Sequence, residues 1–266
     1  MKAASRIFTA IIFIFLFAPI AILLVFSFNA SKSLSVFSGF SFKWYTELFH
    51  DTQTLTSVKN TLILAFLAMV ISTVMGTAAS VGINRIRSRW YRRYMDTVTD
   101  IPMTNPDIIT GISLMLMFVF VGRIFGRSAS LNFGTLLIAH TTFCLPYVIL
   151  QVLPKLQQMD ASLPEAAQDL GCTPLRAFFK VTIPEIAPGI ITGAIMAFTM
   201  SLDDFVISYF TSGNGFQTLP IRIYNMTKKT VTPKMYALAT ITFFVILALL
   251  ILSNLSDGYK RGGKRK

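Results

Sequence analysis

Two adjacent carboxylates, Asp203 and Asp204, lie within an apolar stretch that runs from residue 186 to residue 210. One carboxylate near the middle of a membrane-spanning helix costs about 2.5–3.5 kcal/mol on insertion scales, so the pair costs roughly 5–7 kcal/mol. The apolar side chains of the stretch return a similar sum, and a helix that turned both acids towards lipid would scarcely insert. We therefore expect both acids to face protein or a water-filled path, and at least one to line a path for a solute.

Helix geometry separates the two acids, because neighbouring residues on an α-helix point about 100° apart. In a continuous helix Asp204 shares a face with small and polar residues that suit close packing or a pathway: Gly193, Ala197, Ser201 and Ser208. Asp203 shares its side with Met196, Thr199 and Phe210. The divergence counts against an intramembrane aspartyl hydrolase, whose carboxylates must converge within about 3 Å. Hydrogen bonding to a neighbouring helix is the structural alternative for either acid.

Three further residues are candidates for the path or for its packing. Asp107 follows Asn105 and Pro106, which predicts a helix N-cap, first position and first-turn acid, with a path role as the alternative. Tyr224 could offer a ring face to a cation or anchor the chain at the membrane interface. His140 is expected to be a hydrogen-bonded packing residue rather than a ligand.

Signatures of enzyme chemistry are absent from the sequence. It contains no G-x-x-x-x-G-K-[ST] phosphate loop, no H-E-x-x-H and no G-x-S-x-G. No cluster of metal-ligand residues stands out either. We therefore expect no catalytic residue, no metal and no cofactor in this chain, and no ATP hydrolysis by it.

The elements that must position these residues are membrane helices. The chain has 266 residues, of which 53% are hydrophobic and only 14% are charged, a composition typical of an integral membrane protein. Six apolar stretches approach the length of a spanning helix: 7–28, 58–83, 106–122, 131–153, 186–210 and 236–255. The first is long for a signal peptide and is interpreted as an uncleaved span. With no linker or repeat, residues 1–266 are expected to form a single all-α transmembrane domain.

The net charge of +12 is concentrated at places that indicate topology rather than nucleic-acid binding. One basic cluster lies in residues 85–93 and another in the tail, which includes Lys264, Arg265 and Lys266. The positive-inside rule then predicts that both termini are cytoplasmic, as is the polar loop at about 154–185. The basic residues between 222 and 234 fit this topology poorly, because they lie in a loop predicted outside.

That polar loop contains the string EAAQDLGCTPLRAFFKVTIP. Ser162 and Glu165 have the spacing of a capping box, and Gly171 can end the first helix in a left-handed conformation. Thr173 can cap a second helix whose first turn holds the following proline. Pro184 is expected to stop that second helix. The loop should therefore form a rigid helical hairpin that could dock a partner.

The same string resembles the EAA loop of ABC-importer permeases, in which the loop docks onto an ATPase. The matching positions, which would carry the coupling role, are Glu165, Ala166, Ala167, Gly171 and Pro184. The strings HTTFCLPYV, TMSLDD, TLP, ALAT and NPDI resemble the spermidine/putrescine branch of these permeases. A departure from that branch is Lys234, with Tyr236 two residues on, where it usually has Pro-Glu-x-Asn before ALAT.

The resemblance implies a type I (MetI-like) importer fold with six transmembrane helices in the bacterial inner membrane. It implies a subunit that lies in membrane lipid and pairs with a homologous permease, two ATPase subunits and a periplasmic polyamine-binding protein. ATP and Mg would bind to the ATPase subunits. The substrate path would include Asp203, Asp204, Asp107 and Tyr224. An ABC permease for another small cationic solute and a stand-alone secondary cation carrier are the alternatives, and the second of these would not need the docking loop.

Overall fold

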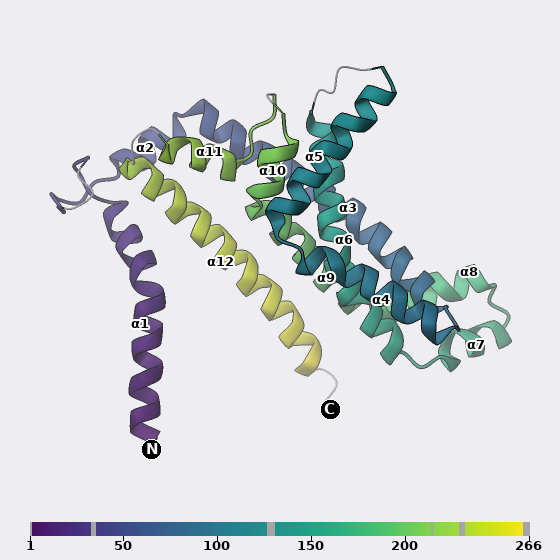
Figure 1. The fold of residues 1–266 in the computed structure, drawn as a ribbon. Helices are drawn as coiled ribbons and strands as arrows, with labels where there is room; N and C mark the ends of the chain where they lie inside the picture. The colour runs from purple at the N-terminus through teal and green to yellow at the C-terminus, as the bar shows by residue number, and fades with distance from the viewer. Residues whose placement is uncertain (1, 33–35, 127–130, 214, 229–231, 263–266) are drawn as a thin grey trace. The chain divides into compact units, whose positions relative to one another are not determined.

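The computed structural model describes residues 2–32, 36–126, 131–213, 215–228 and 232–262, and these are almost entirely helical (Figure 1). The basic tail residues Lys264, Arg265 and Lys266 lie outside the described residues. The elements are α1 Lys2–Phe26, α2 Lys43–Phe49, α3 Thr52–Asn84, α4 Arg89–Thr104, α5 Asp107–Ile124, α6 Phe133–Gln158, α7 Ser162–Asp169, α8 Pro174–Ala177, a π-helical turn η1 Phe178–Thr182, α9 Ile183–Asp203, α10 Val206–Thr211, α11 Leu219–Thr227 and α12 Pro233–Gly262.

Within the described residues, five helical segments are long and apolar enough to cross a membrane. They are Arg6–Phe26, Thr52–Asn84, Asp107–Ile124, Phe133–Gln158 and Pro174–Asp203. A sixth, shorter apolar segment is Pro233–Ala248, within α12. Each of the six apolar stretches predicted from the sequence is therefore helical over most of its length, which confirms the all-α membrane class.

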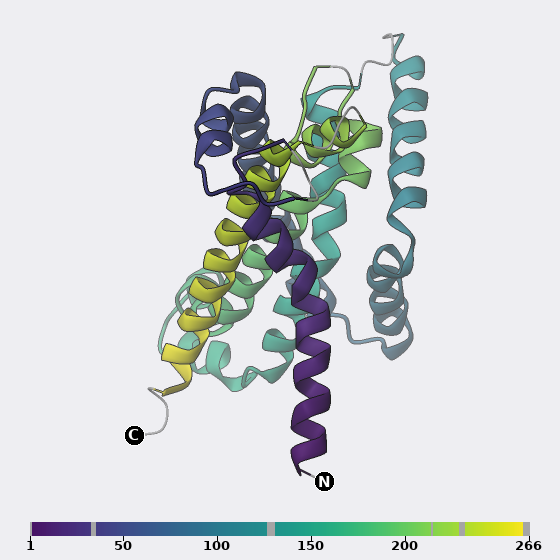
Figure 2. The ribbon, with the colours of Figure 1, turned by 90° about the vertical axis from the view of Figure 1, so that its left-hand side faces the viewer.

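The third predicted span is preceded by a helix that the sequence did not predict. Helix α4 is amphipathic and begins with the basic cluster, and it ends at Thr104, just before Pro106 and the start of α5. Figure 2 shows the two helices following one another with a bend between them. Proline has no N–H and restricts the residue before it, so the chain leaves the helical conformation at this point.

The chain divides into two compact units, of which the first comprises residues Met1–Ser57 and Arg222–Ser256. In this unit the connection between α1 and α2 is held by polar contacts. The Trp44 indole N–H donates to the Asn29 carbonyl at 2.6 Å, and Asn29 Nδ2 donates to the Val36 carbonyl at 2.9 Å. The rings of Phe28 and Phe40 stack with centroids 5.0 Å apart. These contacts give a short irregular segment a defined shape.

The second unit comprises residues Val58–Ile221 and Asp257–Lys266, and its core lies between α6 and α9. Glycines allow the two helices to approach closely: a Cβ at Gly189 would lie 2.7 Å from the Gln151 carbonyl oxygen, and one at Gly193 would lie 3.3 Å from Cα of Val148. Helix α10 packs against α5 and α6 (Figure 1). Small residues at such contacts are the usual means of helix association in membranes.

Candidate functional site

The fifth apolar stretch is not one helix, because it breaks at the paired acids. Helix α9 ends at Asp203, Asp204 has extended backbone angles (φ −63°, ψ 122°), and α10 begins at Val206. The Asp204 carboxylate accepts hydrogen bonds from the backbone N–H of Ile207 at 3.2 Å and of Ser208 at 2.8 Å. An acid in this position satisfies N–H groups that a new helix leaves free. The prediction of a single continuous helix over 186–210 was therefore wrong beyond Asp203.

The break gives the two acids different environments. Asp203 is exposed, whereas the side chain of Asp204 is only 6% exposed. The expected divergence of the pair is confirmed, but the break produces it as well as the helical angle. Asp204 makes structural hydrogen bonds of the kind that the sequence analysis allowed as the alternative, whereas Asp203 is exposed.

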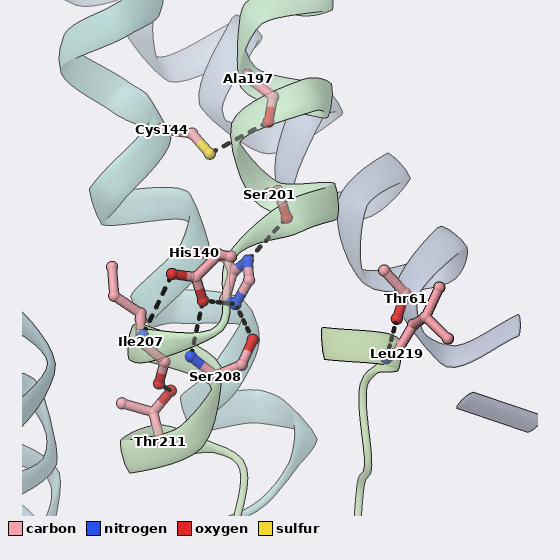
Figure 3. Close-up of polar contacts among 10 residues, drawn as sticks. Thr61, His140, Cys144, Ala197, Ser201, Ile207, Ser208, Thr211 and Leu219 are labelled. Carbon is pink, nitrogen blue, oxygen red and sulfur yellow. Dashed lines mark hydrogen bonds and ion pairs between the residues drawn. The ribbon is translucent and has the colours of Figure 1, made fainter. Parts of the chain in front are cut away.

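His140 of α6 lies beside the break and is fully buried (Figure 3). Its Nδ1 lies 2.7 Å from the Ser201 hydroxyl of α9, and its Nε2 lies 2.9 Å from the Ser208 hydroxyl of α10. The same Nε2 lies 3.4 Å from Oδ2 of Asp204. The prediction that His140 is a hydrogen-bonded packing residue is confirmed.

Asp107 opens α5 as an exposed first-turn acid. The predicted N-cap was displaced by one residue, because Pro106 rather than Asn105 occupies that position and offers no side-chain hydrogen bond. Helix α5 approaches α10 at Gly111, where a Cβ would lie 3.0 Å from the Phe210 ring. Two helix starts, each with an acid, are thus brought together in one unit.

Tyr224 belongs to the other unit, on α11. The ammonium of Lys228 lies 4.5 Å from the centroid of its ring, a cation–π contact within the chain. The ring can therefore engage a cation, as the sequence analysis considered, but in this structure it contacts Lys228, which directly follows the end of its helix.

A second group of acids lies between α4 and α6, and the sequence analysis did not identify it. A hollow there is lined by Asp96, Thr99, Asp100, Ile149, Leu150, Leu153, Pro154 and Gln157. The two acids are one helical turn apart, so they lie on the same face of α4. The i, i+4 spacing was the available signal, but α4 itself had not been predicted.

The polar loop forms the predicted helix and turn. Gly171 follows α7 with φ +88°, its N–H donates to Gln168 at 2.9 Å, and the N–H of Cys172 donates to Ala167 at 3.0 Å. These two bonds form a Schellman motif, in which glycine avoids the steric cost of positive φ. The predicted capping of α8 by Thr173 is confirmed, because its hydroxyl accepts from the Arg176 N–H at 3.4 Å.

Two details of the loop differ from the prediction, and the first is the capping box. Ser162 is already inside α7, and Glu165 lies in the first turn without reaching back. Instead the Asp160 carboxylate accepts from the Ser162 N–H at 2.9 Å and hydroxyl at 2.8 Å. These hydrogen bonds lower the pKa of Asp160. The carboxylate of Asp160, which precedes the helix, therefore takes the place of the predicted capping box.

The second difference is Pro184, which does not stop the second helix. The helical backbone continues from α8 through η1 into α9, so Pro184 lies at the start of α9. Proline lacks an N–H and its ring clashes with the carbonyl four residues earlier, but the wider π-helical turn at Phe178–Thr182 gives room for it. The loop is therefore joined to the span without an interruption.

Exposed apolar side chains surround this loop, and the sequence analysis did not single them out. They are Leu163, Leu170, Leu175 and Phe179, with exposed fractions of 42%, 88%, 69% and 60%. Large apolar side chains exposed on a polar segment can mark a contact with a partner. The available signal for such a surface was the presence of leucine and phenylalanine in an otherwise polar loop.

In the first unit, Asp51 joins the starts of three helices and was also missed. Its carboxylate caps α3 through the N–H of Gln53 at 3.1 Å and of Thr54 at 3.2 Å. Its Oδ2 lies 2.7 Å from Lys234 Nζ of α12 and 3.4 Å from an Arg222 nitrogen of α11. Burial alone would raise the pKa of Asp51, but the hydrogen bonds from Lys234 and Thr54 outweigh it and hold the pKa well below 3.8. Lys234, which departs from the resembled pattern, thus has a partner.

The amino-acid sequence is similar to those of known transport proteins over most of the chain. The chain is 41% identical over 230 residues, 86% of its length and 82% of the relative's, to the putrescine transport system permease protein PotI of Escherichia coli (strain K12). It is 36% identical over 248 residues to the spermidine/putrescine transport system permease protein PotC of Haemophilus influenzae, covering 93% of this chain and 94% of the relative. These relatives are transport permeases and not enzymes.

Solved structures share the fold at low sequence identity. A bacterial ABC transporter involved in the import of the acidic polysaccharide alginate superposes with a TM-score of 0.72 at 18% identity, covering 98% of this chain and 95% of that chain. An amino acid ABC transporter gives a TM-score of 0.56 at 20% identity, covering 82% and 97%. The family model for the binding-protein-dependent transport system inner membrane component matches residues 72–261. The chain therefore belongs to the family of inner membrane components of binding-protein-dependent transport systems.

Proposed function

We propose that this chain is the permease subunit of an ATP-driven importer that moves polyamines such as spermidine and putrescine across the bacterial inner membrane. The observation that carries the proposal is the pair of acids at the α9–α10 break, one exposed and one buried, within an otherwise apolar span. Ionisable groups inside a membrane segment are costly and mark substrate or ion pathways. The relatives named as putrescine and spermidine/putrescine permeases support the same substrate class.

The chemistry of the path suits a solute with several ammonium groups. Asp203 and Asp107 are exposed acids in the same unit, and the acid-bearing hollow between α4 and α6 also belongs to it. Each can attract an ammonium group by charge, while apolar walls accept the methylene chain. A path needs several weak sites rather than one tight site, because tight binding would trap the solute. In the other unit, Tyr224 would offer a ring face to a cation, in exchange for its contact with Lys228.

The loop of α7 and α8 would couple this path to ATP hydrolysis. It presents Glu165, Ala166, Ala167 and Gly171, together with the four exposed apolar residues, for docking to an ATPase subunit. Because α8 continues through η1 and Pro184 into α9, a displacement of the docked loop would be passed directly to the span that carries Asp203. The permease could then alternate between inward-facing and outward-facing states.

The complete importer would contain this chain as a single permease domain, with both termini cytoplasmic, a homologous permease, two ATPase subunits and a periplasmic polyamine-binding protein. ATP and Mg would bind to the ATPase subunits. The solved alginate importer, which was determined in complex with a substrate-bound periplasmic protein, illustrates such an assembly for another substrate.

Reconstitution tests the proposal. This chain is placed in proteoliposomes with a homologous permease and the ATPase, the binding protein is added outside, and ATP is enclosed. Labelled putrescine and spermidine should accumulate only with ATP and the loaded binding protein, and the chain alone should neither accumulate them nor hydrolyse ATP. Uptake of a different small cation with no polyamine uptake would move the proposal to that solute. Gradient-driven exchange by the chain alone would favour a secondary carrier and overturn it.

A further inference from the structure

His140 contacts both sides of the helix break. Ser201, its partner on α9, lies two residues before Asp203, and Ser208, its partner on α10, lies four residues after Asp204. These two serines are 61 and 68 residues away from His140 in the chain, so the contacts join α6 to two separate helices. Figure 3 shows the ring between the two serines, with one nitrogen directed to each.

The hydrogen bonding around this ring is complete. In a neutral imidazole one nitrogen donates and the other accepts, and a serine hydroxyl can do either, so each serine satisfies one nitrogen. Asp204 adds a third connection, because its Oδ2 accepts from the Ser208 N–H at 2.8 Å and lies 3.4 Å from Nε2 of His140. Buried polar groups that are fully paired fix a structure, whereas leaving one unpaired is costly.

Other contacts also hold α10 against α6: Ile207 belongs to the same core cluster as Ala139 and Phe143, and the Thr135 hydroxyl donates to the Thr211 carbonyl at 3.0 Å. A further hydrogen bond of α6, from Cys144 Sγ to the Ala197 carbonyl at 3.3 Å, reaches α9 alone, whereas His140 bonds to a residue on each side of the break. Helix α10 is only six residues long, and because the helix is interrupted before it, its direction is not fixed by that of α9. His140 supplies a link that spans the break.

We propose that His140 is a positioning residue, which holds the α9–α10 break in one geometry and thereby sets the direction in which the exposed Asp203 points. This inference rests on the proposed function for its consequence in transport, since Asp203 is the residue assigned to the path. Its structural part, the restraint on the break, does not depend on which solute is carried.

The test uses the assembled importer with three variants of α6. His140→Phe keeps an aromatic ring but removes both hydrogen bonds, His140→Gln keeps a polar side chain with a donor and an acceptor, and Cys144→Ala is the matched control one helical turn away. Hydrogen–deuterium exchange of peptides covering residues 203–211 reports the amides of Ile207 and Ser208, which are bonded to Asp204. Polyamine uptake per ATP hydrolysed is measured on the same preparations.

In His140→Phe the exchange of these amides should accelerate about tenfold, because a break without its restraint opens more often. Uptake per ATP should fall by about tenfold while the ATPase remains stimulated by the loaded binding protein. His140→Gln should recover part of both, and Cys144→Ala should change neither.

Unchanged exchange in His140→Phe would overturn the inference, and so would an equal acceleration in Cys144→Ala. A parallel fall in assembly, ATPase activity and uptake, with no recovery in His140→Gln, would also overturn it, because it indicates a purely structural role. If His140→Phe does not assemble, Ser208→Ala removes only the α10 anchor, and unchanged exchange there would be decisive against it. If wild-type importer carries no polyamine while the exchange still accelerates, the substrate assignment fails and the restraint on the break stands.

Discussion

Asp203 and Asp204 are consecutive residues on opposite sides of a helix break: the first ends α9 and is exposed, and the second is turned inward to cap α10. The two neighbouring acids therefore have different surroundings. Neutralising each acid should separate transport from stability.

Asp203→Asn removes a charge while keeping the size of the side chain and an oxygen that can accept a hydrogen bond. We expect polyamine uptake to fall about tenfold or more while the complex assembles normally, because an ammonium group loses a partner in a poorly hydrated path. Glu47→Gln, at an exposed acid of α2, is the control and should transport normally. Uptake by proteoliposomes at matched protein level measures the effect, and full uptake by Asp203→Asn would remove this residue from the path.

Asp204→Ala should instead lower the stability of the complex. The substitution leaves the N–H groups of Ile207 and Ser208 without their acceptor, and the loss of a helix cap costs about 0.5–2 kcal/mol. Asp204→Asn should be milder, since asparagine caps almost as well as aspartate. The midpoint of thermal unfolding in detergent checks both variants. A wild-type midpoint for Asp204→Ala would contradict the capping role.

The sequence was sufficient for features that depend on nearby residues. Six apolar stretches predicted helical spans because crossing a bilayer requires a long apolar segment, although the fifth breaks at Asp203. Gly171, Thr173 and Pro174 predicted a turn and a helix start because their preferences are local. The orientation of the termini is still a prediction, as are the roles of the site residues. The family resemblance seen in the EAA and SLDD strings is confirmed by relatives at 36% and 41% identity.

The predictions that failed did so for a different reason. Each of these residues interacts with a partner distant in the chain, or a neighbouring residue takes the role that was predicted for it. The break at Asp204 is supported by His140, 61 residues or more away from the serines that it bonds, and no pattern around Asp204 reveals that. Asp51 likewise meets Lys234 and Arg222 only in three dimensions. The capping box at Ser162 failed because Asp160 was the better acceptor, and Pro184 did not stop its helix because a π-helical turn accommodated it.

Gly171 should be sensitive to any side chain. Its φ of +88° is a region that L residues rarely adopt, so Gly171→Val should cost about 1–2 kcal/mol and tilt α7 relative to α8. We expect the variant to reach the membrane but to retain less ATPase, as judged by co-purification, and Glu165→Ala should weaken the same contact. Gly82→Ala is a suitable control, because a Cβ there meets no atom within 4 Å. Normal co-purification and normal uptake in both loop variants would contradict the coupling role.

The ion-pair cluster at Asp51 predicts a dependence of stability on pH. Because the pKa of Asp51 in the folded protein is held below its ordinary 3.8, the folded state favours the charged carboxylate. Its contribution is therefore fully present above about pH 4 and is lost as the pH falls further, through the folded pKa. Asp51→Asn should lower stability by about 1 kcal/mol at pH 7 through the lost ion pairs, since asparagine can still cap α3.

The measurement is thermal unfolding of the purified protein at pH 7 and at pH 3. Wild type should lose more stability between these values than Asp51→Asn does, so the difference between the two should shrink at the lower pH. Lys234→Met removes one partner and should have a smaller effect of the same sign. An unchanged difference at the two pH values would show that Asp51 is not the responsible group.

The π-helical turn at Phe178–Thr182 should set the orientation of the docking loop relative to the span. A π-helical turn contains one residue more than the corresponding α-helical turn, so deletion of Lys180 should restore a regular helix and rotate α8 by about 100° relative to α9. It would also bring the Pro184 ring back towards the carbonyl that it now avoids. The spans should still insert, since none of their apolar residues is removed.

The exposed Leu170 and Leu175 would then point away from the ATPase, and both ATPase stimulation and uptake should be lost together. Lys180→Ala keeps the length of the chain and should retain both activities. If the deletion transports normally, the continuous helix from loop to span is not the route of coupling.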